Sequence, residues 1–266
     1  MSNIHNLKIA IAASLAAGKE IMNVYNSNNF SIELKEDNSP LTRADKNANE
    51  IINSFLLPTE IPIISEENKQ TPYKQRSNWS TCWIVDPVDG TKEFIKRNGE
   101  FTVNIALIET GKPVLGVIYV PVSKTLFIGD VENQKGGKII LDSHDTAVNI
   151  VFENMVELQP KRKNSNILKV VGSRSHISQE TIDYIENLKA KGKEIEFVSK
   201  GSSLKFCIVA EGNADVYPRF ALTMEWDTAA GQAICNAVGI EVISEETRRP
   251  LAYNKERLLN PWFICK

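Results

Sequence analysis

The stretch from Trp83 to Arg97 constrains this chain more than any other part of the sequence. Its first three residues are apolar, as is typical of a short buried strand. The apolar run stops at Asp86, because the following Pro87 favours extended geometry in the residue before it and cannot continue a strand ladder. The sequence therefore predicts that Asp86 ends a strand, with Asp89 presented by the turn that follows.

The residues after this turn favour an anion and cation site, although they leave an alternative open. Gly90 permits a close approach of the backbone or a positive φ, and residues 92–96 can open a short helix after Thr91. Two carboxylates on a rigid turn, followed by Gly-Thr at a helix start, are suited to hold hard cations and a phosphate. The same residue types also occur in an ordinary β-turn, so the turn alone does not decide between the two.

Two other acidic clusters stand at expected ends of secondary structure. Glu66-Glu67 follows an apolar run at 61–64, and Trp226-Asp227 precedes a helical pattern of small residues. Carboxylates from three separate elements are what an all-oxygen metal site needs. Asp227 is also placed to cap the helix that we expect from Thr228, and this role is compatible with metal binding.

Together these three clusters resemble the inositol monophosphatase superfamily of metal-dependent phosphatases. The segment 92–101, Lys-Glu-Phe-Ile-Lys-Arg-Asn-Gly-Glu-Phe, is most similar to the 3′(2′),5′-bisphosphate nucleotidase branch of that superfamily, the CysQ-like enzymes. The resemblance covers nearly the whole chain. It implies a fold of class α+β / α/β with α-β-α-β-α layers in two packed lobes. We expect residues 1–135 to form an α+β lobe with most metal ligands, and 136–266 an α/β lobe with the nucleotide-recognition residues and Asp227.

The pattern of apolar residues is consistent with that fold. In the first lobe it predicts a helix over 6–25, a second helix after Thr42, and a strand from Phe101 to Ile108 that begins an antiparallel meander. From 131 to 166 the pattern is too weak for a prediction. The second lobe alternates expected strands and helices, which argues for an α/β layer. These are strands at 168–171, 195–198, 214–217 and 240–243, and helices at 178–190, 204–210 and 228–238.

The resemblance implies a set of metal ligands. They are the carboxylates of Glu66, Asp86, Asp89 and Asp227 and the backbone carbonyl of Val88. The expected cofactor is Mg²⁺, as two or three ions, with Mn²⁺ as a substitute. The composition favours the same metals, because three histidines and four scattered cysteines without a Cys-x-x-Cys pair cannot build a typical zinc site.

The resemblance also implies catalytic roles for Asp45, Thr91 and Glu66. Asp45 is expected to hydrogen-bond Thr91, so that the pair accepts the proton of a water that attacks phosphorus. Asp45 has an alternative role, because Thr42 and Asp45 have the spacing of a helix capping box. Both roles for Asp45 stay open at this point.

For substrate binding, the resemblance implies Gly90 and Thr91 at the reacting phosphate, with Asp227 beside them. His176, Ser202, Lys205 and Arg219 are expected to bind the nucleotide and its second phosphate. A lysine and an arginine that converge on a phosphate make sound physical sense, although each alone is more often a surface charge, as is a lone histidine.

The implied substrate is adenosine 3′,5′-bisphosphate, a by-product of sulfate assimilation. Hydrolysis of its 3′-phosphate gives AMP and phosphate; 3′-phosphoadenylyl sulfate is a second candidate, and lithium inhibition is typical of such enzymes. The alternative enzyme is an inositol monophosphatase or broad sugar phosphatase. A non-enzyme alternative is a protein that senses a phosphorylated metabolite without turnover.

Charge and hydropathy limit the partners. The net charge is −2, with acidic and basic residues nearly balanced, so nothing indicates a nucleic-acid-binding face. The sequence has no apolar run of about 18 residues, which argues against an integral membrane segment. We expect a cytoplasmic protein. Peripheral association with the cytoplasmic face of the inner membrane stays open, as does the choice between monomer and homodimer.

Overall fold

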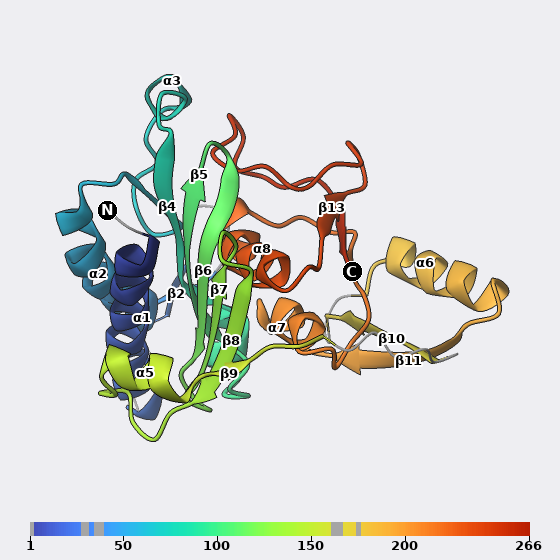
Figure 1. The fold of residues 1–266 in the computed structure, drawn as a ribbon, viewed down its shortest axis with the longest axis horizontal. Coiled ribbons are helices and arrows are strands. Elements are labelled where there is room, and N and C mark those ends of the chain that lie inside the picture. Colours follow the sequence, from blue (N-terminus) through green and yellow to red (C-terminus); the bar gives the residue numbers. More distant parts are fainter. Residues whose placement is uncertain (1–2, 28–31, 35–39, 161–166, 174–176) are drawn as a thin grey trace.

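The computed structural model describes residues 3–27, 32–34, 40–160, 167–173 and 177–266. Helices and sheets alternate in five layers, which confirms the expected α-β-α-β-α arrangement (Figure 1). The first helical layer covers one face of a large sheet, and a second covers the other face. Beyond the second layer lie the small sheets and then one outer helix, which form the projecting end of the molecule.

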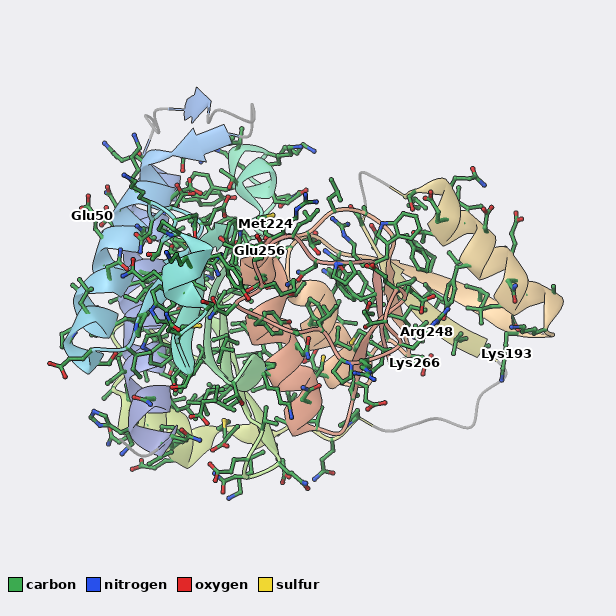
Figure 2. All side chains as sticks on the ribbon, turned by 90° about the horizontal axis from the view of Figure 1, so that it is seen from above. Glu50, Lys193, Met224, Arg248, Glu256 and Lys266 are labelled. Carbon is green, nitrogen blue, oxygen red and sulfur yellow. The ribbon has the colours of Figure 1, made fainter. Side chains whose placement is uncertain are left out.

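The first layer forms because two amphipathic helices bury their apolar stripes on the large sheet. These are α1 (Asn3–Asn26), as predicted from its spacing, and α2 (Arg43–Leu56). Leu7 and Ile11 of α1 belong to the same buried cluster as Trp83 in the sheet. The outer face of α2 is exposed, and Glu50 points away from the molecule there (Figure 2).

The large sheet contains the predicted antiparallel meander. Its strands, in spatial order, are β3 (Ile63–Ser65), β4 (Thr81–Asp89), β5 (Thr102–Glu109), β6 (Lys112–Val120), β7 (Thr125–Asp130), β8 (Lys135–Ile140) and β9 (Val156–Glu157). Only the pair β3 and β4 is parallel. Alternate residues of β5 face opposite layers: Val103 and Ile105 contribute to the cluster under α1, and Ala106 to the cluster on the other face of the sheet.

In the second helical layer, the longer helix lies directly against the backbone of the large sheet, and the shorter one packs on the longer. This layer consists of α7 (Leu204–Ala210) and α8 (Glu225–Ala237). A Cβ atom added at Gly116 of β6 would lie 2.4 Å from the carbonyl oxygen of Ala230, and one added at Gly129 of β7 would lie 2.6 Å from the Cα of Ile234. Glycine in the sheet and small residues on α8 therefore set how closely this helix approaches.

The outer layers are smaller. Strands β10 (Ile167–Gly172) and β11 (Glu194–Ser199) are parallel and are joined by α6 (Gln179–Ala190). A three-stranded antiparallel sheet has the order β12 (Tyr217–Arg219), β14 (Phe263–Cys265), β13 (Val242–Ser244). Lys193, between α6 and β11, lies at the far end of this projection (Figure 2).

The remaining elements are short. They are β1 (Ile32–Leu34), β2 (Pro40–Thr42), η1 (Leu57–Thr59), α3 (Tyr73–Arg76), α4 (Thr91–Ile95) and α5 (Val148–Asn154). The expected strand at 214–217 begins later, at Tyr217, and α8 begins earlier than expected, at Glu225. The division of the chain at residue 135 stays a prediction, and β8 and β9 continue the large sheet after that point. Within the described ranges, no helix has both the length and the apolar character needed to cross a membrane.

The contact between β6 and α8 gives a first prediction. Gly116→Ala would force backbone apart, because the new Cβ meets the carbonyl oxygen of Ala230 at 2.4 Å and the Cβ of Ala233 at 2.7 Å. We expect a loss of about 1–3 kcal/mol in the free energy of unfolding, measured by urea denaturation. Lys112→Ala, at an exposed position of the same strand, is the matched control. An unfolding curve for Gly116→Ala that matches the wild type would show that this contact does not hold the helix.

Candidate active site

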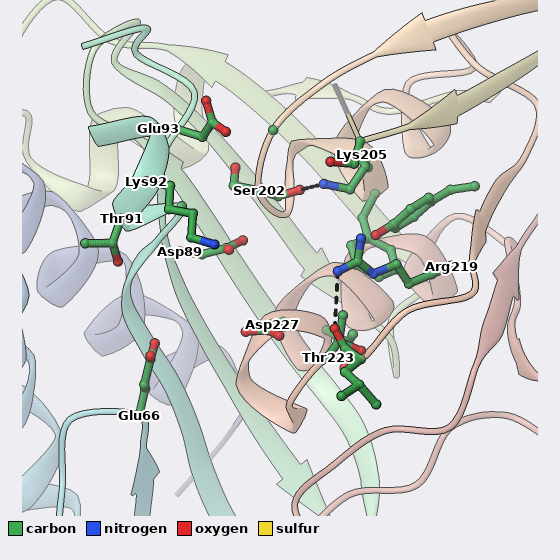
Figure 3. Close-up of a pocket in the computed structure, with 17 residues that line it drawn as sticks. Glu66, Asp89, Thr91, Lys92, Glu93, Ser202, Lys205, Arg219, Thr223 and Asp227 are labelled. Carbon is green, nitrogen blue, oxygen red and sulfur yellow. Dashed lines mark hydrogen bonds between the residues drawn. The ribbon is translucent and has the colours of Figure 1, made fainter. Parts of the chain in front are cut away.

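One cavity of about 460 Å³ collects most of the predicted site residues. It opens between the end of β4, the start of α8 and the loop before α7 (Figure 3). The predicted residues that line it are Glu66, Asp89, Gly90, Thr91, Ser202, Lys205, Arg219 and Asp227. The predicted site residues come from separate stretches of the sequence, and most of them therefore meet in one cavity.

The end of β4 places two aspartates at the cavity. The sequence predicted that this strand stops at Asp86, but the structure extends β4 to Asp89 with a shift of register against β5 between these two residues. The irregularity accommodates Pro87, which cannot donate to a regular ladder. The Val88 N–H donates to Asp86 Oδ1 at 3.0 Å, and Gly90 has a φ of +93°, which turns the chain into α4.

Three carboxylates crowd together at the base of the cavity. Oxygen atoms of Asp86, Asp89 and Asp227 all lie within 4.8 Å of one another. Burial and then the neighbouring charge of Glu66 raise the pKa of Asp86 well above its usual range. Burial and then the charge of Asp89 raise the pKa of Asp227 to about 8. A buried group of mutually repelling carboxylates fits divalent cations, because bound cations would remove this repulsion.

Glu66 adds a fourth carboxylate to the three described above, which together form the acidic wall of the cavity. Glu66 follows β3, whose last residue Ser65 pairs in parallel with Val85 of β4, so both strands end at the same side of the sheet. Glu66 points into the cavity (Figure 3). Asp227 projects from the first turn of α8, where its carboxylate accepts the Met224 N–H at 2.8 Å. Asp227 thus supports the helix end as expected, at the third helical position rather than just before the helix.

Asp45 makes both of the contacts that the sequence left open, the helix cap and the hydrogen bond with Thr91. Its Oδ2 accepts the Thr42 N–H at 2.8 Å in the capping box of α2. Its Oδ1 accepts the Thr91 hydroxyl at 3.2 Å, and that hydroxyl also lies 3.3 Å from the Val88 carbonyl oxygen. Asp45 is 1% exposed, so this carboxylate is reached through Thr91 rather than directly from solvent.

The opposite wall of the cavity is basic. Lys205 of α7 is buried, its ammonium group donates to the Ser202 carbonyl, and it lies 5.5 Å from the centre of the Tyr217 ring. Burial lowers the pKa of Lys205 to about 8, although the charge of Asp89 opposes the shift. In the described structure, two buried polar atoms on this wall, Ser202 Oγ and Arg219 Nε, have no hydrogen-bond partner. Such donors fit an anionic ligand.

Other residues support the site without having been predicted. The Ser203 N–H and the Asn104 amide both donate to Asp89, and the Ser203 hydroxyl contacts Thr102 and Asn104 at 2.8 Å. Asn104 carries a signal that sequence reasoning could have used, because it is a polar residue inside an otherwise apolar strand. His176 lies outside the described residues, so its expected place at the nucleotide stays a prediction.

The sequence of this chain is similar to those of known proteins. The inositol monophosphatase family profile matches residues 4–261. The chain is 44% identical over 250 residues to the 3′(2′),5′-bisphosphate nucleotidase CysQ of Salmonella typhimurium, a match that covers 93% of this chain and 94% of that protein. It is 43% identical over 251 residues to the enzyme of the same name from Escherichia coli K12, and this match covers 93% of this chain and 94% of that protein.

A solved structure agrees over almost the whole length. The crystal structure of CysQ from Bacteroides thetaiotaomicron, described as a bacterial member of the inositol monophosphatase family, superposes with a TM-score of 0.88 and 49% identity. That match covers 98% of this chain and 97% of the other. The chain therefore belongs to the inositol monophosphatase family.

Proposed function

We propose that this protein is a Mg²⁺-dependent 3′(2′),5′-bisphosphate nucleotidase that hydrolyses adenosine 3′,5′-bisphosphate to AMP and phosphate. One observation carries the proposal: the same cavity has an acidic wall that includes Asp89 and a basic wall that includes Lys205. A ligand with two phosphates can use both walls at once. The similar proteins from Salmonella and Escherichia are 3′(2′),5′-bisphosphate nucleotidases, which supports this substrate class.

The acidic wall would hold the metal. Its ligands would be the carboxylates of Glu66, Asp86, Asp89 and Asp227 and the carbonyl of Val88, around two or three Mg²⁺ ions or Mn²⁺ in their place. When bound, such ions neutralise phosphate charge and lower the pKa of a coordinated water. Oxygen-only donors of this kind are the ligands that Mg²⁺ prefers.

The residues of the chain itself supply the proton acceptor and the phosphate cradle. The Thr91 hydroxyl donates to Asp45, so it can take a proton from the attacking water as it passes its own proton to that carboxylate. Glu66, which lines the same cavity, orients that water (Figure 3). Backbone N–H groups of Gly90 and Thr91 at the start of α4 hold the reacting phosphate, with Asp227 on its other side.

The basic wall selects the substrate. Lys205, Arg219 and Ser202 bind the phosphate that does not react, and His176 contacts the nucleotide. An inositol monophosphate has no second anion for this wall, which makes the alternative phosphatase activity the weaker candidate. The hydrogen bond between Thr91 and Asp45 argues against a protein that only senses its ligand, since binding alone needs no proton acceptor.

The proposal extends to second substrates, lobes and location. 3′-Phosphoadenylyl sulfate carries the same 3′-phosphate and is a second candidate substrate. We propose that the site is divided between lobes 1–135 and 136–266, because Asp86 and Asp89 come from the first and Lys205 and Asp227 from the second. Because this substrate arises during sulfate assimilation inside the cell, we place the reaction in the cytoplasm.

Asp89→Asn tests the acidic wall. Loss of this carboxylate should lower turnover of adenosine 3′,5′-bisphosphate by more than about 100-fold, because even groups behind metal ligands contribute 10- to 100-fold. Phosphate release is measured with Mg²⁺ and with EDTA, for the nucleotide bisphosphate, 3′-phosphoadenylyl sulfate and inositol 1-phosphate. Circular dichroism and urea unfolding check that the variant is folded. Wild-type turnover in a folded Asp89→Asn protein would refute the assignment of Asp89 as a metal ligand.

The raised pKa values of Asp86 and Asp227 predict how pH affects the metal-free protein. A carboxyl group whose pKa is higher in the folded state stabilises the fold below its unfolded pKa of about 3.9, and this contribution is lost as pH rises through the folded pKa. For Asp227 the folded pKa is about 8. In EDTA the melting temperature should therefore fall from pH 6 to pH 9. Added Mg²⁺ should raise it by an amount that grows over the same range, and a constant increment would contradict the carboxylate cluster as the metal site.

Lys205 gives a test of substrate choice. Lys205→Ala should raise KM for adenosine 3′,5′-bisphosphate by at least about 10-fold, because a charge-assisted bond to phosphate is lost, and should affect inositol 1-phosphate much less. Since the pKa of Lys205 is about 8, KM of the wild type should also rise as pH passes this value. Lys205→Arg should move that rise to higher pH. Equal losses for both substrates would show that Lys205 does not bind a second phosphate.

A further inference from the structure

We infer that Glu100 is the positioning residue for the second-phosphate subsite, because it fixes the loop of residues 200–203 that carries Ser202 and leads to Lys205. This inference rests on the proposed function and names a part of the site that the sequence motifs did not assign. Glu100 does not line the cavity itself. Its effect on the substrate is therefore exerted through the loop, which we call the phosphate loop.

The phosphate loop is held by two carboxylates from across the site. Its Gly201 N–H donates to Glu100 Oε2 at 2.8 Å, and its Ser203 N–H donates to Asp89. Both carboxylates come from the part of the chain around β4 and β5. The N–H groups of the two residues that flank Ser202 are thus hydrogen-bonded to carboxylates from the side of the site where the reacting phosphate would lie.

Ser202 needs this support because its backbone is strained. Its φ is +44°, in the left-handed region, which costs a residue with a Cβ on the order of 1–2 kcal/mol. Such a conformation persists only where its neighbours determine it. The Ser202 carbonyl accepts a hydrogen bond from the Lys205 ammonium group (Figure 3). The Ser202 hydroxyl is buried and has no hydrogen-bond partner in the described structure. The conformation of Ser202 therefore sets the direction of two groups that would bind the second phosphate.

Of the two contacts that Glu100 makes to the loop, the one to Gly201 matters more. The ion pair between Glu100 and Lys200 is 3.3 Å long and the lysine side chain is 40% exposed, so solvent screens it and it contributes little. The Glu100 side chain is only 12% exposed, so its charge-assisted bond from the Gly201 N–H is sheltered. A Cβ at Gly201 would lie 3.1 Å from the Glu100 carbonyl oxygen and 3.2 Å from its Oε2. Glycine is thus what allows this approach.

Glu100 is itself held in place by its local turn. The Glu100 N–H donates to Asn98 Oδ1 at 2.9 Å, and the Asn98 amide donates to Glu93 at the rim of the cavity. Gly99, between them, has a φ of +77°. The turn after α4 therefore presents the Glu100 carboxylate to the phosphate loop.

The test compares a substrate with two phosphates and one with a single phosphate. kcat and KM are measured with Mg²⁺ for adenosine 3′,5′-bisphosphate and for adenosine 3′-monophosphate, which lacks the second phosphate. We expect Glu100→Ala to lower the ratio of the two kcat/KM values, bisphosphate over monophosphate, by about 10-fold, mainly through KM. Glu100→Gln should preserve most of this ratio, because its amide oxygen still accepts the Gly201 N–H. Glu50→Ala, on the outer face of α2, is the matched control that should leave both substrates unchanged (Figure 2).

Two further measurements test the positioning role of Glu100. Gly201→Ala places a Cβ against Glu100 and should reduce the same ratio even if Glu100→Ala does not fold. Calorimetric binding of AMP, which carries only the second phosphate, should weaken by about 10-fold in Glu100→Ala. Equal losses for both substrates, or an unchanged ratio in every folded variant, would overturn the positioning role. A wild type that turns over both nucleotides equally well would instead refute the proposed function on which the inference rests.

Discussion

The main constraint on the site is that three carboxylates, one buried and two partly buried, are held close enough to repel one another. Asp86, Asp89 and Asp227 approach within 4.8 Å, and their raised pKa values show that the fold opposes their ionisation. Such an arrangement persists because rigid elements impose it: the irregular end of β4 for two of them and the first turn of α8 for the third. A fold that only maximised its own stability would not place three like charges here. Bound divalent cations would offset this repulsion.

Three aspartates in and around this cluster each have two structural roles. Asp45 uses one carboxylate oxygen to cap α2 and the other to accept a hydrogen bond from the Thr91 hydroxyl, so the same side chain fixes the helix start and the position of that hydroxyl. Asp227 supports the start of α8 while facing the other aspartates. Asp89 faces the cluster and also accepts a hydrogen bond from the Ser203 N–H in the loop before α7. The acidic wall and the basic wall are therefore mechanically connected.

The sequence predicted those features that follow from local patterns. Apolar spacing was sufficient for α1 and for the meander β5 to β7, and the two possible roles of Asp45 could be stated from its spacing to Thr42. The family resemblance supplied the convergence of Glu66 with Asp227, which no local pattern contains. The short strand β14 could not be predicted, because a three-residue strand is specified by its partners β12 and β13 rather than by its own residues. Nor could Glu100 be assigned a role, since its partner Gly201 is distant in sequence and an isolated acid more often faces solvent.

The glycines beneath α8 have a consequence for motion. Where Gly116 and Gly129 face this helix, they meet only backbone atoms and the Cβ of Ala233, so no rotamer can change there and alter the spacing. The body of α8 therefore keeps its height above the strands while side chains elsewhere fluctuate on the nanosecond scale, and its first turn extends from this fixed part. An aspartate carried on so stiff a support would hold its distance to β4 throughout a reaction cycle, leaving the loops on the opposite wall to adapt to whatever enters.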